Sequence, residues 1–230
     1  MGCGVGEAMQ RAVLFDLDDT LHDRAAAIPM FVVSQACRLL EMQVPDAVRF
    51  AERFVELEER GRVWKDRVYK ELGREFPQAR HADERLLDDY MRSFPKVCRL
   101  RQGAAELLRQ LRDRAVKLGI VTNGRSDMQL AVVSALGLGD LVDTVVISES
   151  IGLRKPDPRI FYNALTQIGV EAQSSVFVGD DLRSDVEGAL SAGFKHVYWF
   201  DAAAVAESDV PPRTSRVTGF AELTERLLPV

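Results

Sequence analysis

An apolar run that breaks abruptly into acids, close to the start of the chain, is the feature that most constrains the fold. Ala12 to Phe15 are all apolar, and carboxylates follow at Asp16, Asp18 and Asp19. A run of this kind without polar alternation is typical of a strand buried on both faces, as in a parallel sheet. Acids at the C-terminal end of such a strand would lie where open α/β sheets bind their ligands. A polar turn after the strand is the alternative interpretation.

The spacing of the first two acids points to a cation. Asp16 and Asp18 are two residues apart, so an extended backbone would point both side chains the same way. Two carboxylates held together repel each other, and one would become neutral unless a cation lay nearby. His22 follows closely and could touch a ligand, but we interpret it as a partly exposed loop residue.

Composition limits the class of protein. The chain has 230 residues, of which 47% are hydrophobic and 28% charged, as expected for one globular domain or one domain with an insert. The net charge of −5 gives no reason to expect nucleic acid or an anionic membrane as a partner. No apolar run approaches the length of a membrane span. We therefore expect neither a nucleic acid nor a membrane partner.

The cysteines and the N-terminus indicate a compartment. The three cysteines have no close spacing and are odd in number, which suits a reducing cytoplasm better than a disulfide framework. The three histidines are scattered, which argues against a metal site built mainly from imidazole. Residues 1–10 lack the basic start and long apolar core of a signal peptide, and we expect a loose tail there.

Residues 23–94 show helical periodicity and no strand signal, which predicts a small all-helical insert. Within it, residues 61–70 are dense in arginine, lysine and aromatic side chains. Arg and Lys suit an anionic ligand, and Trp64 or Tyr69 could stack on a ring. A solvated, amphipathic helix face explains the same segment equally well.

From residue 95 onward, helices and strands alternate. Apolar strands are predicted at 117–122, 144–148, 175–180 and 196–200, with helices at 103–114, 126–136, 157–169, 184–193 and 220–228 and a loop at 201–214. Asp157 is the expected cap of one helix, and Ser184 with Glu187 forms a capping box for another. The alternation predicts an α/β fold, a Rossmann-like parallel sheet covered by helices on both faces. Residues 1–22 and 95–230 would form this core domain, and residues 23–94 an inserted helical cap.

Four separated segments would place polar groups at the same edge of that sheet. Each lies at the C-terminal end of a strand or in the loop after it. They are Asp16 with Asp18, Thr122-Asn123-Gly124, Lys155-Pro156, and Gly179-Asp180-Asp181 with Asp185.

This set resembles the haloacid dehalogenase-like superfamily of hydrolases. Phe15 to Leu21 reads Phe-Asp-Leu-Asp-Asp-Thr-Leu, a specific signature, and Thr-Asn-Gly, Lys-Pro-Asp-Pro and Gly-Asp-Asp-x-x-x-Asp follow in the family's order. The resemblance covers nearly the whole chain outside the tail and the insert. It implies a phosphatase that acts on a small phosphorylated metabolite through an aspartyl-phosphate.

The resemblance also implies a role for each acid. Asp16 would attack phosphorus, and Asp18 would act as general acid and then general base. Mg²⁺ would be the cofactor, held by the Asp16 side chain, the Asp18 backbone carbonyl and Asp180, since all-oxygen ligands suit this hard ion. Asp185 would orient metal-bound water or hold the lysine, and Asp181 could share that role.

Phosphate binding is assigned in the same way. Thr122 and the backbone N–H groups of Asn123 and Gly124 would hold phosphate oxygens, helped by the dipole of the following helix. Lys155 would pair with both the phosphoryl group and Asp16 as a point charge.

Several alternatives stay open at this point. Haloacid dehalogenases resemble the chain in fold but lack an acid equivalent to Asp18, and phosphonoacetaldehyde hydrolases use a cap lysine, for which Lys65 or Lys70 could serve. A catalytically idle binding domain is the alternative from another class, although Asp16, Lys155 and Asp180 are all present. Within the phosphatases, the motifs resemble the pyrimidine 5′-nucleotidases and related enzymes of small metabolites. A monomer or homodimer is expected.

Overall fold

The computed structural model describes residues 11–200 and 210–229, and these fall into two compact units. One, here named the core unit, contains the described residues up to Leu21, residues Arg101–Ser126 and those from Gly137 onward. The other, the helical unit, contains His22–Leu100 and Asp127–Leu136. The expected tail at residues 1–10 and most of the expected loop at 201–214 lie outside the described residues.

The core unit alternates strands and helices along the chain. Its elements are β1 (Ala12–Phe15), α5 (Ala104–Asp113), β2 (Lys117–Thr122), β3 (Thr144–Ile147), α7 (Ser148–Ile151), α8 (Pro158–Ile168), the 3₁₀ turn η3 (Ala172–Ser174), β4 (Ser175–Gly179), the π-helical segment η4 (Leu182–Glu187), α9 (Gly188–Ser191), β5 (His196–Phe200), β6 (Thr214–Val217) and α10 (Phe220–Leu227).

The strands form one sheet in the order β3-β2-β1-β4-β5-β6, and every neighbouring pair is parallel. The predicted parallel sheet is therefore confirmed. From β1 the chain adds β2 and β3 on one side, then crosses to add β4, β5 and β6 on the other. The C-terminal ends of β1 and β4 thus flank a topological switch point, where sheets of this type bind ligands.

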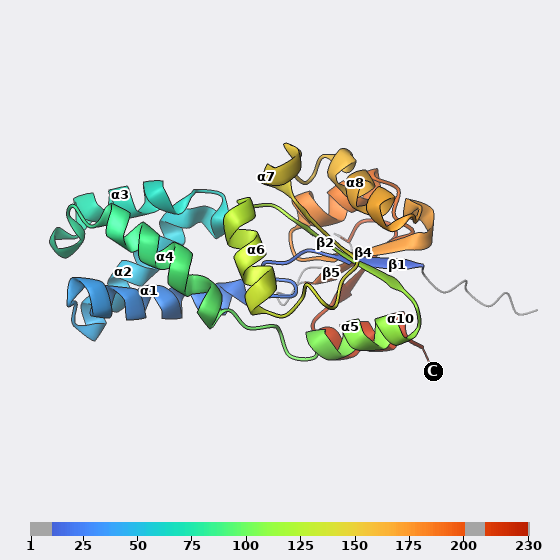
Figure 1. Cartoon of the computed structure of the whole chain (residues 1–230), viewed down its shortest axis with the longest axis horizontal. Coiled ribbons are helices and arrows are strands. Elements are labelled where there is room, and N and C mark those ends of the chain that lie inside the picture. Colours follow the sequence, from blue (N-terminus) through green and yellow to red (C-terminus); the bar gives the residue numbers. More distant parts are fainter. Residues whose placement is uncertain (1–10, 201–209, 230) are drawn as a thin grey trace, which may run out of the picture. The chain divides into compact units, whose positions relative to one another are not determined.

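Helices cover both faces of this sheet, as predicted. Figure 1 shows α8 on one face and α5 with α10 on the other. On the α8 face, Phe161, Phe177 and Phe194 meet edge to face with ring centroids 5.1 to 5.8 Å apart. These fully buried rings anchor α8 to β4 in the middle of the sheet.

The helix starts in the core unit agree only in part with the sequence. Asp157 caps α8 as predicted, because its side chain accepts a hydrogen bond from the Arg159 N–H at 3.0 Å. The predicted capping box at Ser184 is wrong. Asp181 is the capping residue, and its carboxylate accepts the Ser184 N–H at 2.7 Å. The segment therefore starts earlier, at Leu182, and its first turns are π-helical.

The helical unit holds α1 (Arg24–Leu40), α2 (Val44–Glu58), η1 (Glu59–Gly61), α3 (Lys65–Glu75), η2 (Pro77–Ala79), α4 (Asp83–Val97) and nearly all of α6 (Ser126–Ala135). No strand occurs among residues 23–94, as the periodicity predicted. The sequence had assigned residues 126–136 to the core domain, whereas Asp127–Leu136 groups with the helical unit. The functional division into core and cap stays a prediction.

Aromatic rings fill the interior of the helical unit. Tyr90 and Phe94 stack with centroids 4.9 Å apart, and Phe31 meets both of them edge to face at 5.6 Å. His22 is fully buried and meets the edge of Phe94 at 6.0 Å. The interpretation of His22 as a partly exposed loop residue is therefore wrong, because tertiary packing covers it.

A buried ionic cluster joins three helices of the same unit. Glu58 at the end of α2 forms a two-pronged ion pair with Arg24 of α1 and accepts a hydrogen bond from Lys65 Nζ of α3 at 2.7 Å. Burial raises the pKa of Glu58, but the hydrogen bonds and charges of Arg24 and Lys65 outweigh burial and lower that pKa overall. Glu58 is therefore ionised at neutral pH.

Candidate active site

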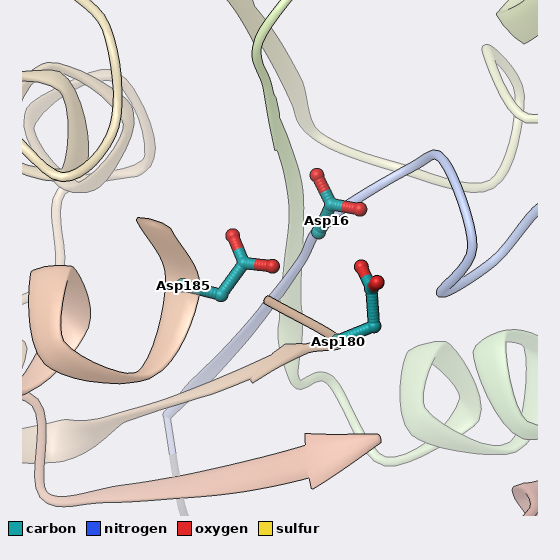
Figure 2. A group of neighbouring side chains, drawn as sticks. All are labelled: Asp16, Asp180 and Asp185. Atoms are coloured by element: carbon teal, nitrogen blue, oxygen red, sulfur yellow. The ribbon is translucent and has the colours of Figure 1, made fainter. Parts of the chain in front are cut away.

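Three carboxylates converge at the C-terminal edge of the core sheet. Asp16 follows β1, Asp180 follows β4 and Asp185 belongs to η4, and Figure 2 shows their carboxylates turned toward one another. One oxygen from each lies within 4.8 Å of the others. The backbone explains the meeting, because β1 and β4 are adjacent and the Asp16 N–H donates to the Val178 carbonyl at 2.9 Å.

Lys155 lies between two of these acids. Its Nζ is 2.5 Å from Asp16 Oδ1 and 2.7 Å from Asp185 Oδ1, and the residue is only 3% exposed. Burial lowers the pKa of Lys155, but the two carboxylates outweigh burial and raise it overall. The lysine is therefore a fixed positive charge beside Asp16 at physiological pH.

The charge balance around Asp16 is unfavourable to its ionised form. Burial raises the pKa of Asp16 well above its usual value, Asp185 and Asp180 raise it further, and Lys155 acts in the opposite direction. The Lys155 ammonium thus contacts two buried carboxylates, and the half-buried Asp180 adds a third negative charge beside them. A divalent cation beside Asp16 would favour the carboxylate, because a bound cation stabilises neighbouring negative charge.

Asp185 is held so that both of its oxygens are engaged. Oδ1 pairs with Lys155, and Oδ2 accepts the Asp181 N–H at 3.1 Å. The approach requires glycine at the end of β4, since a Cβ on Gly179 would lie 2.5 Å from Asp185 Cγ. This arrangement suits a residue that positions Lys155 and the loop after β4 more than it suits a direct metal ligand.

The Thr122-Asn123-Gly124 segment reaches the same edge. Thr122 ends β2 and is 1% exposed. The side chain of Asn123 donates to the Lys155 carbonyl at 3.0 Å and accepts the Lys155 N–H at 2.9 Å. The Gly124 N–H, which the sequence assigned to phosphate, donates to Ser148 Oγ at 3.0 Å. Asn123 thus has a side-chain role that the sequence did not predict.

Two of the predicted residues lie at the margin of the cluster. Asp18 is half-buried two residues after Asp16, beyond the group of three converging carboxylates. Asp181 uses one carboxylate oxygen to cap η4. The proposed chemical roles of both stay predictions.

Three further residues around the site were not predicted. The Thr20 hydroxyl lies 3.4 Å from Asp180 Oδ1, Ser148 bonds the backbone of Gly124, and the Trp199 indole donates to the Asp180 carbonyl at 2.9 Å. Thr20 lies within the acidic motif, so its sequence position was a usable signal. Ser148 and Trp199 carry no such signal, because only the fold brings them to the site.

The donor set fits a hard divalent cation. Asp16 and Asp180 offer carboxylate oxygens within 4.8 Å of each other, with Asp185 as a third acid beside them, and carboxylates are the ligands that Mg²⁺ prefers. The three carboxylates together carry more negative charge than Lys155 balances, and one divalent cation would offset the excess.

Comparison with known proteins agrees with this geometry. Residues 13–198 match the family described as haloacid dehalogenase-like hydrolase. The chain is 32% identical over 214 residues to a glyceraldehyde 3-phosphate phosphatase of Pyrococcus abyssi, covering 84% of this chain and 82% of the relative. It is 35% identical over 144 residues to the pyrimidine 5′-nucleotidase YjjG of Escherichia coli, covering 62% and 63%. The chain therefore belongs to the haloacid dehalogenase-like hydrolases.

Solved structures show the same fold. The hydrolase YfnB of Bacillus subtilis, described as bound to magnesium with interdomain movement, has a TM-score of 0.73 and 25% identity and covers 96% of this chain and 100% of its own. A phosphatase of this family from Thermococcus onnurineus has a TM-score of 0.67 and 28% identity and covers 95% and 98%. Among residues 11–200 and 210–229, no helix is long and apolar enough to span a membrane.

Proposed function

We propose that Asp16 is the nucleophile of a phosphatase that hydrolyses a small phosphorylated metabolite through an aspartyl-phosphate. Phosphatase activity follows from the family together with relatives named as glyceraldehyde 3-phosphate phosphatase, pyrimidine 5′-nucleotidase and phosphoserine phosphatase. The observation that carries the assignment of Asp16 is its 2.5 Å contact with Lys155 at the switch point of the sheet. A carboxylate held there by a fixed cation is oriented for attack and shielded from the charge of the substrate.

The chemical steps need a nucleophile and a proton carrier. Asp16 attacks phosphorus in line, and the alcohol leaves as Asp18 donates a proton to its oxygen. Asp18 then takes a proton from the water that attacks the aspartyl-phosphate, which releases inorganic phosphate and restores both acids. Lys155 neutralises charge on the phosphoryl oxygens, where catalysis of phosphoryl transfer depends mainly on electrostatics.

Mg²⁺ is the cofactor that this donor set fits. Asp16, Asp180 and the backbone carbonyl of Asp18 would hold it, and when bound it supplies Lewis-acid neutralisation of the phosphoryl group. Asp185 positions Lys155 and the 180–181 loop by the contacts described above, and Asp181 secures the start of η4. Relatives of known structure support the choice of metal, since YfnB is described as bound to magnesium.

Phosphate oxygens are held by the segment after β2. The Thr122 hydroxyl and the backbone N–H of Asn123 are the primary donors. The Gly124 N–H can join them only by exchanging its bond to Ser148. Backbone donors are already fixed before the reaction, so they can stabilise the phosphoryl oxygens in the transition state with little reorganisation.

The rest of the substrate is selected by the helical unit, acting as the cap. Within residues 61–70, Trp64 and Arg67 are the side chains that suit an anionic or ring-bearing metabolite. The expected stacking by Tyr69 is wrong, because Tyr69 is fully buried, as is Lys65. Three-carbon phosphates come first among candidates because three curated relatives at 31% to 32% identity are named as glyceraldehyde 3-phosphate phosphatases. Nucleoside monophosphates and sugar phosphates follow. A cytoplasmic monomer or homodimer is the expected form.

Dehalogenation is the alternative that the fold permits, since a 2-haloacid dehalogenase of Pseudomonas syringae is 25% identical with a TM-score of 0.64. Asp18 and the phosphatase relatives favour phosphate esters.

A screen with purified protein and Mg²⁺ tests the proposal, with release of inorganic phosphate as the readout. Its panel contains glyceraldehyde 3-phosphate, phosphoglycolate, phosphoserine, nucleoside monophosphates and hexose phosphates. Parallel assays with 2-haloacids measure halide release. Phosphate release from at least one panel member, lost in Asp16→Asn, is expected. Halide release without phosphate release would overturn the proposal.

A further inference from the structure

Trp199 on β5 contacts the backbone that carries one of the clustered acids. It pairs in register with Gly179 of β4, and its indole N–H donates to the Asp180 carbonyl at 2.9 Å. Trp199 is 6% exposed and belongs to the same hydrophobic cluster as Phe177. The ring therefore has little freedom, and the hydrogen bond fixes the direction of the carbonyl.

The neighbouring N–H group of the same peptide is also fixed by a side chain. Asp185 Oδ2 accepts the Asp181 N–H at 3.1 Å. The carbonyl of Asp180 and the N–H of Asp181 belong to one planar peptide unit, so a hydrogen bond at each end sets the orientation of the whole plane. Strand β4 ends at Gly179, so beyond it the backbone is held by hydrogen bonds to side chains and no longer by hydrogen bonds between strands.

The orientation of that plane matters because it directs the Asp180 side chain. The Cα–Cβ bond of Asp180 is attached to this peptide, and its carboxylate must meet those of Asp16 and Asp185 within 4.8 Å. Fixing the peptide limits the torsion angle at the Asp180 Cα, and so it limits movement of the backbone from which the carboxylate projects. Removing a group that orients a metal ligand through a hydrogen bond commonly weakens metal binding about 10–100-fold.

We propose that Trp199 is a positioning residue for the divalent-cation site, acting through the 180–181 peptide to hold the Asp180 carboxylate in place. The inference rests on the proposed function for the identity of the metal as Mg²⁺. It adds a residue outside the acidic motifs, on a strand that contributes no ligand itself. Loss of the indole N–H should weaken Mg²⁺ binding while leaving the nucleophile and Lys155 unchanged.

The test measures Mg²⁺ binding by isothermal titration calorimetry, without substrate. Trp199→Phe keeps an aromatic ring and removes the donor, and Trp64→Phe is the matched control because the chain has only two tryptophans. We expect the dissociation constant for Mg²⁺ to rise about 10–100-fold in Trp199→Phe and to stay unchanged in Trp64→Phe. In turnover assays, Trp199→Phe should need more Mg²⁺ but recover most of kcat when Mg²⁺ is saturating.

A second variant covers the case in which Trp199→Phe fails to fold. In the Trp64→Phe background, tryptophan can be replaced throughout by 3-benzothienylalanine, which puts sulfur in place of the indole N–H and alters position 199 alone. The same loss of Mg²⁺ affinity is expected. An unchanged dissociation constant in this folded protein overturns the inference.

The failure of the inference can be told apart from that of the proposed function. Wild-type protein that hydrolyses phosphate esters with Mg²⁺, together with an unchanged Mg²⁺ dissociation constant in Trp199→Phe, overturns the role of Trp199 alone. A weaker Mg²⁺ affinity in Trp199→Phe, together with wild-type protein that binds Mg²⁺ but hydrolyses no phosphate ester, overturns the proposed function alone.

Discussion

Asn123 and Lys155 hold each other by two reciprocal hydrogen bonds, although 32 residues separate them. The Asn123 amide donates to the Lys155 carbonyl at 3.0 Å, and its oxygen accepts the Lys155 N–H at 2.9 Å. The same lysine then extends its ammonium to Asp16 at 2.5 Å. A side chain after β2 thus sets the backbone from which the cation beside the nucleophile is projected.

Asn123→Ala should lower kcat more than it changes KM, because Lys155 would lose its backbone anchor while phosphate binding by Thr122 remains. Two neutral hydrogen bonds contribute about 1–3 kcal/mol, which corresponds to about a 5- to 150-fold fall in kcat if the loss is felt in the transition state. Asn163→Ala on α8 is the control, because this side chain accepts a hydrogen bond from the exposed Gln167 side chain and lies outside the carboxylate cluster. A rise in KM with unchanged kcat would contradict this role.

Replacing the two acids of the first motif should separate their functions. Asp16→Asn removes the nucleophile and should abolish turnover. Asp18→Asn removes proton transfer, which typically contributes about 10²–10⁴-fold, so this variant should be slow rather than inactive. The loss should be smaller on p-nitrophenyl phosphate than on an alkyl phosphate, because nitrophenolate needs little protonation to leave. Equal losses on both esters would show that Asp18 is not the general acid.

Removal of the metal should stop the reaction. A chelator is expected to abolish phosphate release and Mg²⁺ to restore it, because the carboxylates around Asp16 otherwise repel a phosphate dianion. Asp180→Asn should raise the Mg²⁺ concentration needed for half-maximal rate by at least about 10-fold, as one charged ligand is lost. Asp140→Asn, an exposed acid in a loop, is the control. Full activity in a metal-free preparation would rule out the site as described.

The buried cluster of the helical unit should make stability depend on pH. Glu58→Gln leaves Arg24 and Lys65 buried without their carboxylate, and removing one partner of a buried pair costs about 3–5 kcal/mol in the free energy of unfolding. The pKa of Glu58 is lowered in the folded chain, so its stabilisation is present above the usual value of 4.5 and is lost as pH falls below it. Urea unfolding at several pH values should show wild type and Glu58→Gln converging in acid. Glu75→Gln, in an exposed pair with Arg53, should change stability little.

The proposed cap segment should control which ester is preferred. Arg67→Ala should alter the ranking of substrates by kcat/KM while leaving hydrolysis of p-nitrophenyl phosphate nearly unchanged, because a small aryl ester makes few contacts outside the phosphoryl site. Arg74→Ala, an exposed residue on the same helix outside residues 61–70, is the control. An unaltered ranking in Arg67→Ala would mean that this segment is a solvated helix face.

Much of the core fold could be predicted from the sequence, because a strand buried on both faces appears as a short continuous run of apolar residues. The runs at β1, β2, β4 and β5 are apolar and end in polar residues, so their type and their functional ends were predictable from a few adjacent positions. β6 was missed because Thr214–Val217 is an edge strand with a single buried residue, Val217, and carries no such run. The start of η4 was misplaced because Asp181 and Ser184 are both good capping residues, and only the backbone geometry decides between them.

The sequence by itself determined a parallel α/β sheet, an all-helical insert and the set of acids, amide and lysine at the strand ends. Only the tertiary structure decided which of them meet. In the fold, the Lys155 ammonium contacts Asp16, which is 139 residues away in the sequence. The Asn123 side chain bonds the backbone of Lys155, and the Trp199 indole bonds the Asp180 carbonyl. The physical reason is that hydrophobic periodicity is a local property of the chain. The partner of a buried charge or hydrogen-bond donor, in contrast, is set by strand order and side-chain packing across the whole sheet.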